Sequence, residues 1–390
     1  MKQYEYLIIG GGLTGDAAVK GIRELDMTGS IGMLSLEADP PYIRPSLSKS
    51  VWKGKSIEKI WCNTKDLGID LHLSCKAIKL DPKAKTIFDE KGNKYSYNKL
   101  LLATGGSPIH LPFGEDSIIY YRGFQDYQRL RALADRGEKF LVIGGGFIGS
   151  EIAAALTMIG KKVSMVFPEK TIGERVYPND LAQFITTYYQ QKGVEIICED
   201  VIASLESKGD KISVRTPKGK VFEVDGVIAG IGIRPNIELA EQALLKIENG
   251  ITVDEHLRTS DLDIYAAGDV ANFYHSSLGK RVRVEHEDNA VQMGKMAGRN
   301  MAGSNESYTH VPMFYTDLFD LGYEAVGELN SKMETVADWK EPFKKGVLYY
   351  LTDGRVRGVL LWNTWDTVPS ARELLLEPGP FTPADLIGKL

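Results

Sequence analysis

Two glycine-rich motifs are the residues of this chain with the clearest chemical meaning. One runs from Gly10 to Gly15 after the apolar stretch Tyr6-Leu-Ile-Ile, and the other runs from Gly144 to Gly149 after Phe140-Leu-Val-Ile. In a G-x-G-x-x-G turn, glycine lets the backbone approach a pyrophosphate, and the N-terminus of the following helix attracts the phosphate charge. Because the motif occurs twice, the sequence predicts that the chain binds two dinucleotides and passes electrons between them.

Each motif also predicts the elements that hold it, namely a parallel strand, a tight turn and a helix. The first glycine of each motif, Gly10 or Gly144, makes the tight turn. The second, Gly12 or Gly146, lets the backbone approach the pyrophosphate, and the third, Gly15 or Gly149, lets the helix pack closely on the strand. An acid about 20 residues further on is expected to bind ribose hydroxyls. Glu37 fills that role in the first unit. In the second unit Phe167 occupies the usual position, and Glu169 follows two residues later.

Composition limits the class of protein. A chain of 390 residues suits two or three domains, and its 43% apolar and 25% charged content is ordinary for a globular protein. The net charge of −5 argues against a general nucleic-acid binder, and no apolar run approaches the roughly 18 residues of a membrane span. The three cysteines, Cys62, Cys75 and Cys198, are too scattered for a disulfide framework. With no signal or transit peptide visible at the start, a cytoplasmic protein is expected.

Turn signals divide the rest of the chain. The Pro-rich stretch 39–49 is expected to lack regular structure, because its three prolines disfavour helix and sheet. A hairpin is expected around Ser207–Asp210 and a turn at Asp353-Gly354. From about residue 306, aromatic strand-like runs indicate a separate α+β domain.

Further segments support a family resemblance along nearly the whole chain. They are Pro41-Tyr-Ile-Arg-Pro-Ser-Leu-Ser-Lys49, Ala103-Thr-Gly105, Tyr265-Ala-Ala-Gly-Asp269, Val284-Glu-His-Glu-Asp-Asn-Ala290, Met313-Phe-Tyr-Thr-Asp-Leu, Gly322-Tyr-Glu-Ala-Val-Gly327 and Gly358-Val-Leu-Leu-Trp-Asn363. Together with the glycine motifs they resemble the FAD-dependent pyridine-nucleotide-disulfide reductase superfamily. Within it, the chain is most similar to ferredoxin and rubredoxin reductases and to the apoptosis-inducing-factor-like group, which the tail segments resemble most.

The resemblance implies an α/β fold with two doubly wound, Rossmann-like nucleotide-binding domains and a C-terminal α+β domain. The FAD-binding domain is expected to be discontinuous. The expected boundaries are 1–115 with 245–305 for FAD, 116–244 for NAD(P)H, and 306–390 for the C-terminal domain. The cofactors implied are one FAD and one NAD(P)H, and no metal ligand is expected.

Cofactor contacts follow from the positions that match the family's motifs. They are Gly10, Gly12, Gly15, Glu37, Arg44, Lys49, Ala77, Ala103, Thr104, Gly105, Arg122, Gly144, Gly146, Gly149, Glu169, Gly232, Gly268, Asp269, Glu285, His286 and Trp362. Asp269 is expected to bind the ribityl chain of FAD, or else to be an ordinary helix cap. Glu285 and His286 are expected near the nicotinamide and the flavin ring, with a structural histidine as the alternative. Trp362 is expected either beside the isoalloxazine or in the core.

One departure from the family decides the chemistry. Disulfide reductases of the superfamily carry a redox cysteine pair, and related enzymes a single cysteine, in the loop after the first acid. Here that loop contains Arg44, Ser46, Ser48 and Lys49, and the first cysteine of the chain is Cys62. A thiol relay cannot operate from this loop, so electrons are expected to leave the flavin directly for an external acceptor.

Three residues are expected to act in hydride transfer. The resemblance places Lys49 near the reactive flavin nitrogen, paired with Glu151, where a cation stabilises the negative charge of reduced flavin. Phe147, inside the second glycine motif, is expected to gate the isoalloxazine. The alternatives are a surface lysine and a packing aromatic. NADH is favoured over NADPH, because Glu169 would repel a 2′-phosphate and no arginine adjoins it in sequence, although Lys170 does.

The acceptor is predicted from charge. Between residues 44 and 59 the cations Arg44, Lys49, Lys53, Lys55 and Lys59 face one acid, Glu58. A basic rim would steer a small acidic ferredoxin or rubredoxin, although a solvated cationic face without a partner is equally expected. The alternatives are an apoptosis-inducing-factor-like redox sensor with a stable charge-transfer complex, and a peroxide-forming NADH oxidase. A membrane quinone reductase is disfavoured, and the chain is expected to be a monomer or homodimer.

Overall fold

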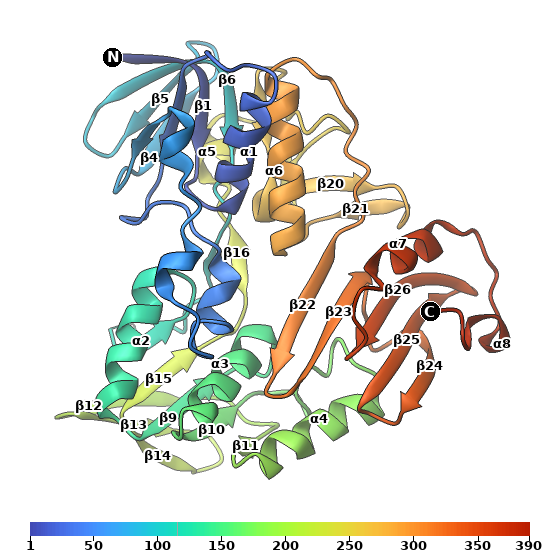
Figure 1. Cartoon of the computed structure of the whole chain (residues 1–390). Helices are drawn as coiled ribbons and strands as arrows, with labels where there is room; N and C mark the ends of the chain where they lie inside the picture. Colours follow the sequence, from blue (N-terminus) through green and yellow to red (C-terminus); the bar gives the residue numbers. More distant parts are fainter. Residues whose placement is uncertain (115) are drawn as a thin grey trace. The chain divides into compact units, whose positions relative to one another are not determined.

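The computed structural model describes residues 1–114 and 116–390, which form two compact units. Unit 1 comprises Met1–Arg44, Ser56–Ser107 and Arg234–Pro312, and unit 2 comprises Pro45–Lys55, Pro108–Ile233 and Met313–Leu390. The chain therefore passes between the units more than once. Two of these passages are marked by β7 (Gly106–Pro108) and β16 (Ile233–Pro235), which pair with each other; β16 is labelled in Figure 1.

Unit 1 is built on a seven-stranded sheet of order β3-β2-β1-β6-β5-β4, with β19 on β6. The strands are β1 (Lys2–Ile9), β2 (Ile31–Leu34), β3 (Asp70–His72), β4 (Ala77–Asp81), β5 (Thr86–Asp89), β6 (Lys94–Leu102) and β19 (Ile264–Ala266). Strands β3, β2, β1, β6 and β19 pair in parallel, as expected when helices connect them. Smaller pieces are β17 (Ile247–Glu248), β18 (Gly250–Thr252), β20 (Ala271–His275), β21 (Lys280–Val282) and α5 (Glu238–Gln242).

Two helices of unit 1 cross closely. Helices α1 (Leu13–Arg23) and α6 (Glu287–Met301) lie side by side (Figure 1). Small residues permit this approach, since a Cβ on Gly298 would lie 2.1 Å from the carbonyl oxygen of Ala18. The packing fixes α1, and with it the first glycine turn, at the end of β1.

Unit 2 contains a parallel sheet of order β11-β10-β9-β15-β8 and an antiparallel sheet of order β22-β23-β26-β25-β24. The parallel strands are β8 (Ile118–Tyr120), β9 (Lys139–Ile143), β10 (Lys162–Val166), β11 (Glu195–Ile197) and β15 (Gly226–Ala229), with helices α2 (Phe124–Arg136), α3 (Phe147–Met158) and α4 (Asn179–Gln191). The antiparallel strands are β22 (Met313–Leu318), β23 (Leu321–Gly327), β24 (Glu334–Glu341), β25 (Lys345–Thr352) and β26 (Arg355–Trp362), followed by α7 (Val368–Leu376) and α8 (Pro383–Leu386). The predicted fold class is confirmed. The three-domain division stays a prediction.

Local predictions agree with the structure at two turns and fail at one. Strands β12 (Ser204–Lys208) and β13 (Lys211–Arg215) form the expected hairpin, which β14 (Val221–Val224) extends, and Asp353-Gly354 joins β25 to β26. The stretch 39–49 was expected to lack regular structure, but Arg44–Ser48 form a 3-10 helix. Pro45 is tolerated there because the first turn of a helix needs no N–H donor from that residue. Two further 3-10 turns are Ile57–Ile60 and Thr64–Leu67.

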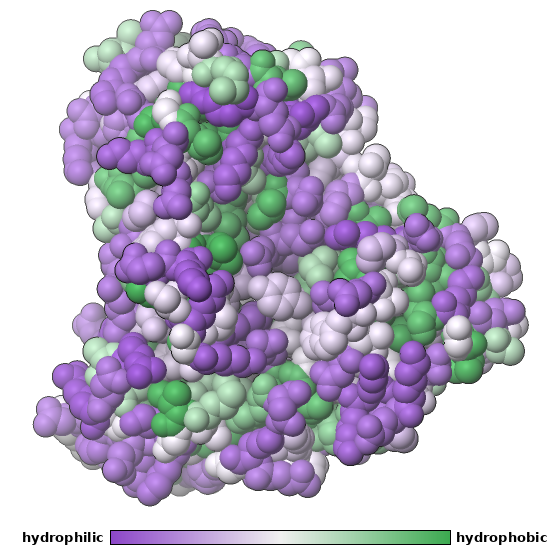
Figure 2. All heavy atoms as spheres, in the orientation of Figure 1, coloured by the Kyte–Doolittle hydropathy of each residue, from purple (hydrophilic) through white to green (hydrophobic). Residues whose placement is uncertain are grey.

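The surface is mainly polar on the face shown in Figure 2, where hydrophobic side chains appear in separate small groups. Such scattering is ordinary for a water-exposed protein surface. Across residues 1–114 and 116–390, no helix combines the length and apolar character that crossing a membrane requires.

Candidate nucleotide and redox sites

The first glycine turn fits a pyrophosphate. Gly10 has φ 125°, and a Cβ there would lie 2.0 Å from the carbonyl oxygen of Ala103. A Cβ on Gly15 would lie 2.3 Å from the Gly10 oxygen, so both positions exclude side chains. Gly12 is the N-cap of α1, no side chain caps the helix there, and a Cβ would point into open space. The turn therefore leaves the helix N-terminus open to a phosphate group, as FAD requires.

The acid of unit 1 lies in a polar cluster. The Glu37 carboxylate accepts hydrogen bonds from the Tyr42 hydroxyl at 2.6 Å and from the Arg44 guanidinium at 2.5 Å. Arg44 also lies over the Tyr42 ring, 4.9 Å from its centroid. These two hydrogen bonds hold the Glu37 side chain in place. Because the side chain remains 35% exposed, it is still accessible to a ribose. The sequence predicted Glu37 and Arg44, but it gave no sign of Tyr42.

The crossover segment is fixed by an asparagine that the sequence did not single out. The Thr104 hydroxyl donates to the Asn236 carbonyl oxygen at 2.7 Å, and the Asn236 side-chain amide donates to the Thr104 carbonyl oxygen at 2.9 Å. The Asn236 backbone N–H donates to the Gly105 carbonyl oxygen at 3.0 Å. Thr104 and Gly105 thus lie where the chain leaves unit 1, directly after Ala103.

The second half of unit 1 supplies Gly268 and Asp269. Gly268 has φ 76° and lies against Thr14 of α1, because a Cβ would be 2.2 Å from the Thr14 hydroxyl oxygen. Asp269 lies in a three-residue 3-10 helix, Gly268–Val270, rather than at the start of an α-helix. The Arg283 guanidinium donates to the Asp269 carbonyl oxygen at 3.0 Å and pairs with Glu285 at 2.5 Å. These contacts bring Asp269 and Glu285 together around one arginine.

For three further residues predicted to contact a cofactor, the structure gives the backbone position. Ala77 is the first residue of β4, and His286 is the N-cap of α6 in an extended conformation. Arg122 belongs to unit 2, where its backbone N–H donates to Asp126 at 3.0 Å just before α2. Their roles at a cofactor stay predictions.

The second glycine turn repeats the geometry of the first. Gly144 has φ 109°, with a Cβ position 2.4 Å from the Gly230 carbonyl oxygen, and a Cβ on Gly149 would lie 2.0 Å from the Gly144 oxygen. Gly146 is the uncapped N-cap of α3 and again faces open space. Helix α3 therefore presents a second open N-terminus suited to a pyrophosphate.

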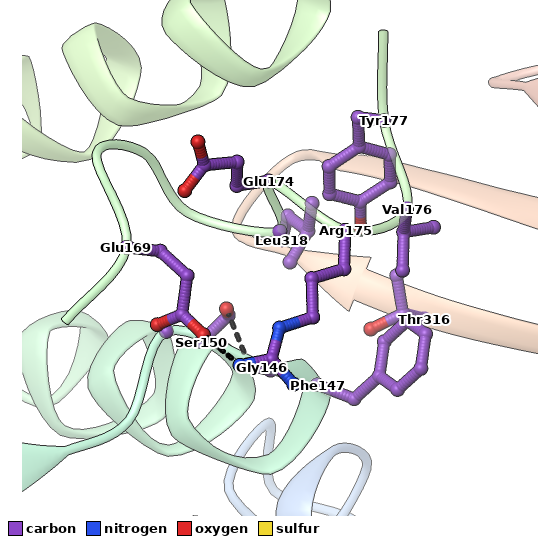
Figure 3. A pocket seen from close by; sticks show the side chains of 12 residues that line it. Gly146, Phe147, Ser150, Glu169, Glu174, Arg175, Val176, Tyr177, Thr316 and Leu318 are labelled. Carbon is purple, nitrogen blue, oxygen red and sulfur yellow. Dashed lines mark hydrogen bonds and ion pairs between the residues drawn. The ribbon is translucent and has the colours of Figure 1, made fainter. Parts of the chain in front are cut away.

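A pocket beside this turn contains the second acid. Figure 3 shows the pocket, whose lining residues are Gly145, Gly146, Phe147, Ser150, Glu169, Gly173, Glu174, Arg175, Val176, Tyr177, Thr316 and Leu318. Phe167, directly after β10, is buried under Gly145. Glu169, which is 23% exposed, is therefore the acid that reaches the pocket. The Glu169 carboxylate pairs with Arg175 at 2.8 Å. No arginine adjoins Glu169 in the sequence, but Arg175 adjoins it in the structure, because the loop after Glu169 turns back at Gly173.

The predicted ion pair between Lys49 and Glu151 is present and buried. The Lys49 ammonium lies 2.8 Å from the Glu151 carboxylate, with the two side chains 9% and 2% exposed. Ser48 donates to one carboxylate oxygen at 2.5 Å and Thr316 donates to the other at 2.6 Å. The surface-lysine alternative for Lys49 is therefore wrong. Every oxygen of Glu151 has a donor, which a buried carboxylate needs.

Strand β22 supports all three predicted catalytic residues. Phe314 contacts the Phe147 ring edge-on at 5.5 Å, the Tyr315 ring lies 5.2 Å from the Lys49 ammonium, and Thr316 binds Glu151. Phe147 keeps 37% of its surface exposed, so a movable aromatic is compatible with the structure. The sequence indicated no role for these three β22 residues. They lie far from Lys49 and Glu151 along the chain, and no local pattern shows which distant segments fold together.

Two predicted contacts lie elsewhere in unit 2. Trp362 is fully buried, with its ring stacked on Tyr323 at 5.8 Å and its indole N–H donated to the Phe343 carbonyl oxygen at 2.8 Å. The core alternative therefore describes Trp362, and contact with the isoalloxazine is not supported. Gly232, with φ 100°, accepts a hydrogen bond from Ile109 at 2.9 Å next to the passage out of unit 2.

Two of the three cysteines, Cys62 and Cys75, are poorly suited to redox chemistry. Burial, with a smaller contribution from Asp16, raises the pKa of Cys62 to about 12, and burial also raises the pKa of Cys75. A thiol with so high a pKa is a poor nucleophile at neutral pH. We expect Cys62→Ser to leave the rate of flavin reduction by NADH unchanged, measured by anaerobic stopped-flow absorbance. A large loss of rate at unchanged FAD content would instead implicate this thiol. Among the described residues, no group of three or more His, Cys, Asp or Glu is placed to hold a metal ion.

Comparisons with known proteins agree with this geometry. Residues 4–294 match the pyridine nucleotide-disulphide oxidoreductase family, and residues 297–342 and 337–377 match the C-terminal domain of mitochondrion-associated apoptosis-inducing factor. The chain is 33% identical to apoptosis-inducing factor 1, mitochondrial, of Dictyostelium discoideum, over 97% of this chain and 79% of that protein. It is 35% identical to monodehydroascorbate reductase 3 of Arabidopsis thaliana, over 92% of this chain and 89% of that protein.

A solved structure is also similar over nearly the full length. It is a chain of the covalent putidaredoxin reductase–putidaredoxin complex, with a TM-score of 0.91, 27% identity, and coverage of 98% of this chain and 95% of that chain. The two glycine turns, their acids and the sequence matches lead to the same conclusion. The chain belongs to the pyridine nucleotide-disulphide oxidoreductase family and is an FAD-dependent NAD(P)H oxidoreductase.

Proposed function

We propose that this protein oxidises NADH, passes the electrons through FAD, and delivers them to a small acidic ferredoxin or rubredoxin without using a thiol. The observation that carries the proposal is the buried ion pair between Lys49, in a loop that contains no cysteine, and Glu151 of helix α3. FAD, when bound, accepts a hydride and releases electrons to an acceptor. The similarity to the chain in the putidaredoxin reductase complex supports the protein acceptor.

The residues of the chain have separate tasks in this mechanism. Glu37 and Glu169 orient the two nucleotides through ribose hydroxyls, and the turns at Gly12 and Gly146 admit the pyrophosphates. Phe147 covers the reacting centre and keeps water out until NADH displaces it. Lys49 supplies a fixed positive charge for the negative charge that develops on reduction, and Glu151 holds Lys49 in position.

The basic rim beside this centre is smaller than the sequence suggests. Arg44 and Lys49 pair with Glu37 and Glu151, and Lys53 pairs with Asp317 at 2.8 Å. Lys55 and Lys59 are exposed. Steering of an acidic partner is therefore assigned to these two lysines.

This assignment makes a salt-dependent prediction. We expect Lys55→Gln with Lys59→Gln to lower the second-order rate of ferredoxin reduction about three- to tenfold at low salt and little at high salt, because steering is screened. The matched control is Lys83→Gln with Lys218→Gln, which removes two exposed lysines elsewhere. Ferredoxin reduction followed against ionic strength measures both. An equal decrease in the control pair would contradict a docking role.

A second candidate acceptor is a small organic radical, which the similarity to monodehydroascorbate reductase 3 favours. The test is to reduce the protein with NADH without oxygen and then add ferredoxin, monodehydroascorbate or air. Fast reoxidation by ferredoxin supports the proposal, and fast reoxidation by the radical alone supports the second candidate. Slow reoxidation by all three, with a lasting charge-transfer band, favours a redox sensor, and rapid peroxide formation in air favours an oxidase.

A further inference from the structure

We propose that Tyr121 is a positioning residue for flavin reduction, whose hydroxyl holds the backbone that carries Lys49 and so keeps the Lys49 charge in a fixed place. The inference rests on the proposed function, since it assumes that Lys49 stabilises reduced flavin. It deepens that function by naming the residue through which the parallel sheet of unit 2 controls the placement of Lys49.

The Lys49 segment, Pro45–Lys55, is anchored through one carbonyl group. The Leu47 carbonyl oxygen accepts hydrogen bonds from the Tyr121 hydroxyl at 2.5 Å and from the Trp52 indole N–H at 2.7 Å. Leu47 is 1% exposed, and Trp52 and Tyr121 are each 5% exposed. A buried carbonyl oxygen has to be hydrogen-bonded within the protein, so the loss of a donor here costs more than it would at the surface.

The anchor lies directly before the residues that bind Glu151. Ser48 and Lys49, the next two residues, donate to the Glu151 carboxylate at 2.5 and 2.8 Å. The Lys49 N–H donates to the Ser46 oxygen and the Trp52 N–H donates to the Lys49 oxygen, both at 3.2 Å, which keeps the segment in tight turns. A shift of the Leu47 carbonyl would therefore move the Lys49 ammonium, and a misplacement of about 1 Å at a reacting centre can cost about 10²-fold in rate.

Tyr121 is fixed to the sheet that also holds the second glycine turn. It directly follows β8, and its backbone N–H donates to the Ala229 carbonyl oxygen at the end of β15 at 3.3 Å. The next residue of that strand end, Gly230, donates its N–H to the carbonyl oxygen of Ile143, directly before the glycine turn, at 2.9 Å. The Tyr121 hydroxyl thus ties the Lys49 segment to the same backbone that positions the coenzyme turn.

Both donors to Leu47 are held ready to donate. Burial raises the pKa of the Tyr121 hydroxyl above its usual value, so the group stays protonated at neutral pH. The Trp52 ring packs edge-on against Tyr127 of α2 at 5.6 Å and lies 5.6 Å from the Arg131 guanidinium of the same helix. The Trp52 indole N–H also lies 3.4 Å from the Tyr121 hydroxyl oxygen, so the two donors and the carbonyl form one network.

The dependence of the effect on Lys49 tests the inference. Tyr121→Phe is expected to lower the limiting rate of flavin reduction by NADH about three- to tenfold, the range of one lost hydrogen bond, with the Kd for NADH within about twofold of wild type. In a Lys49→Met background the same substitution should change the rate less than about twofold, because the charge that it positions is gone. The midpoint potential of the flavin should fall in Tyr121→Phe, but by less than in Lys49→Met.

A second variant addresses the shared acceptor. Trp52→Phe removes the other donor and is expected to slow flavin reduction in the same way. The double variant leaves the Leu47 carbonyl without either side-chain donor, so its loss of rate is expected to exceed the product of the two single losses. Hydrogen exchange of the FAD-loaded protein provides a readout without turnover. The peptide that covers Pro45–Lys55 should exchange faster in each single variant than in the wild type.

The matched control is Tyr127→Phe, which removes a hydroxyl from the ring that packs on Trp52 and leaves both donors to Leu47 in place. Its rate, potential and hydrogen exchange should equal those of the wild type. An unchanged rate in Tyr121→Phe, or an equal loss with and without Lys49, would overturn the inference while leaving the proposed function intact. A loss of rate that merely follows loss of bound FAD in both Tyr121→Phe and Trp52→Phe would also overturn it. A wild-type rate in Lys49→Met would overturn both.

Discussion

Gly146→Asp is expected to give a folded, yellow protein that NADH no longer reduces. Gly146 is the N-cap of α3, its Cβ position faces open space, and aspartate is a favoured N-cap residue. The new carboxylate would occupy the amide donors and repel the pyrophosphate. We expect the affinity for NADH to fall about a hundredfold or more, because several charge-assisted hydrogen bonds are lost. Anaerobic NADH titration, read by flavin absorbance, measures the effect.

The matched variant is Gly12→Asp in the first turn. Gly12 is the N-cap of α1 and also faces open space, so the same substitution changes the other nucleotide site with equally little strain. This variant is expected to fold but to purify without FAD. The assignment of the two turns would be contradicted if Gly146→Asp lost FAD, or if Gly12→Asp kept FAD and lost only its reaction with NADH.

Lys49→Met is expected to slow reduction of the flavin by NADH about 10²- to 10³-fold, the usual effect of removing one preorganised electrostatic group from a reacting centre. NADH affinity should change little, because Lys49 does not line the Glu169 pocket. The midpoint potential of the flavin should fall, since the positive charge that stabilises the reduced form is gone. Single-turnover stopped flow and a redox titration measure these quantities.

Two controls separate charge from folding. Lys53→Met removes a lysine of the same segment whose ion pair with Asp317 is partly exposed, so about 1 kcal/mol or less is at stake and the rate should be unchanged. Lys49→Met leaves Glu151 buried without its cation, which costs about 3–5 kcal/mol of stability. Adding Glu151→Gln should restore stability but not rate. Recovery of rate in the double variant would mean that Lys49 is only structural.

Local structure was predictable from the sequence wherever the residues that determine it lie close together along the chain. The strand–turn–helix units at Gly10 and Gly144, the hairpin at Ser207 and the turn at Asp353 all follow from residues within a few positions of each other. The 3-10 helix at Pro45 does not follow from the proline content of its segment, because proline disfavours a helix interior but not its first turn.

Long-range partners were not predictable in the same way. Thr316 reaches Glu151 from the C-terminal sheet, and a threonine in a strand carries no mark of such a role. Arg175 is six residues after Glu169, a spacing that brings them together only because Gly173 turns the loop back. Trp362 shows a related limit, since its motif left a place beside the isoalloxazine and a place in the core equally open, and only the structure shows that it packs in the core.

The most direct test of the central claim is an anaerobic titration of the FAD-loaded protein with NADH, recorded by flavin absorbance. A flavin that takes a hydride with no thiol relay should be fully reduced by a stoichiometric amount of NADH, with or without prior alkylation of the cysteines. A requirement for additional NADH before the flavin is reduced, or loss of reduction after alkylation, would contradict the account, and no reduction at all would remove the second nucleotide site.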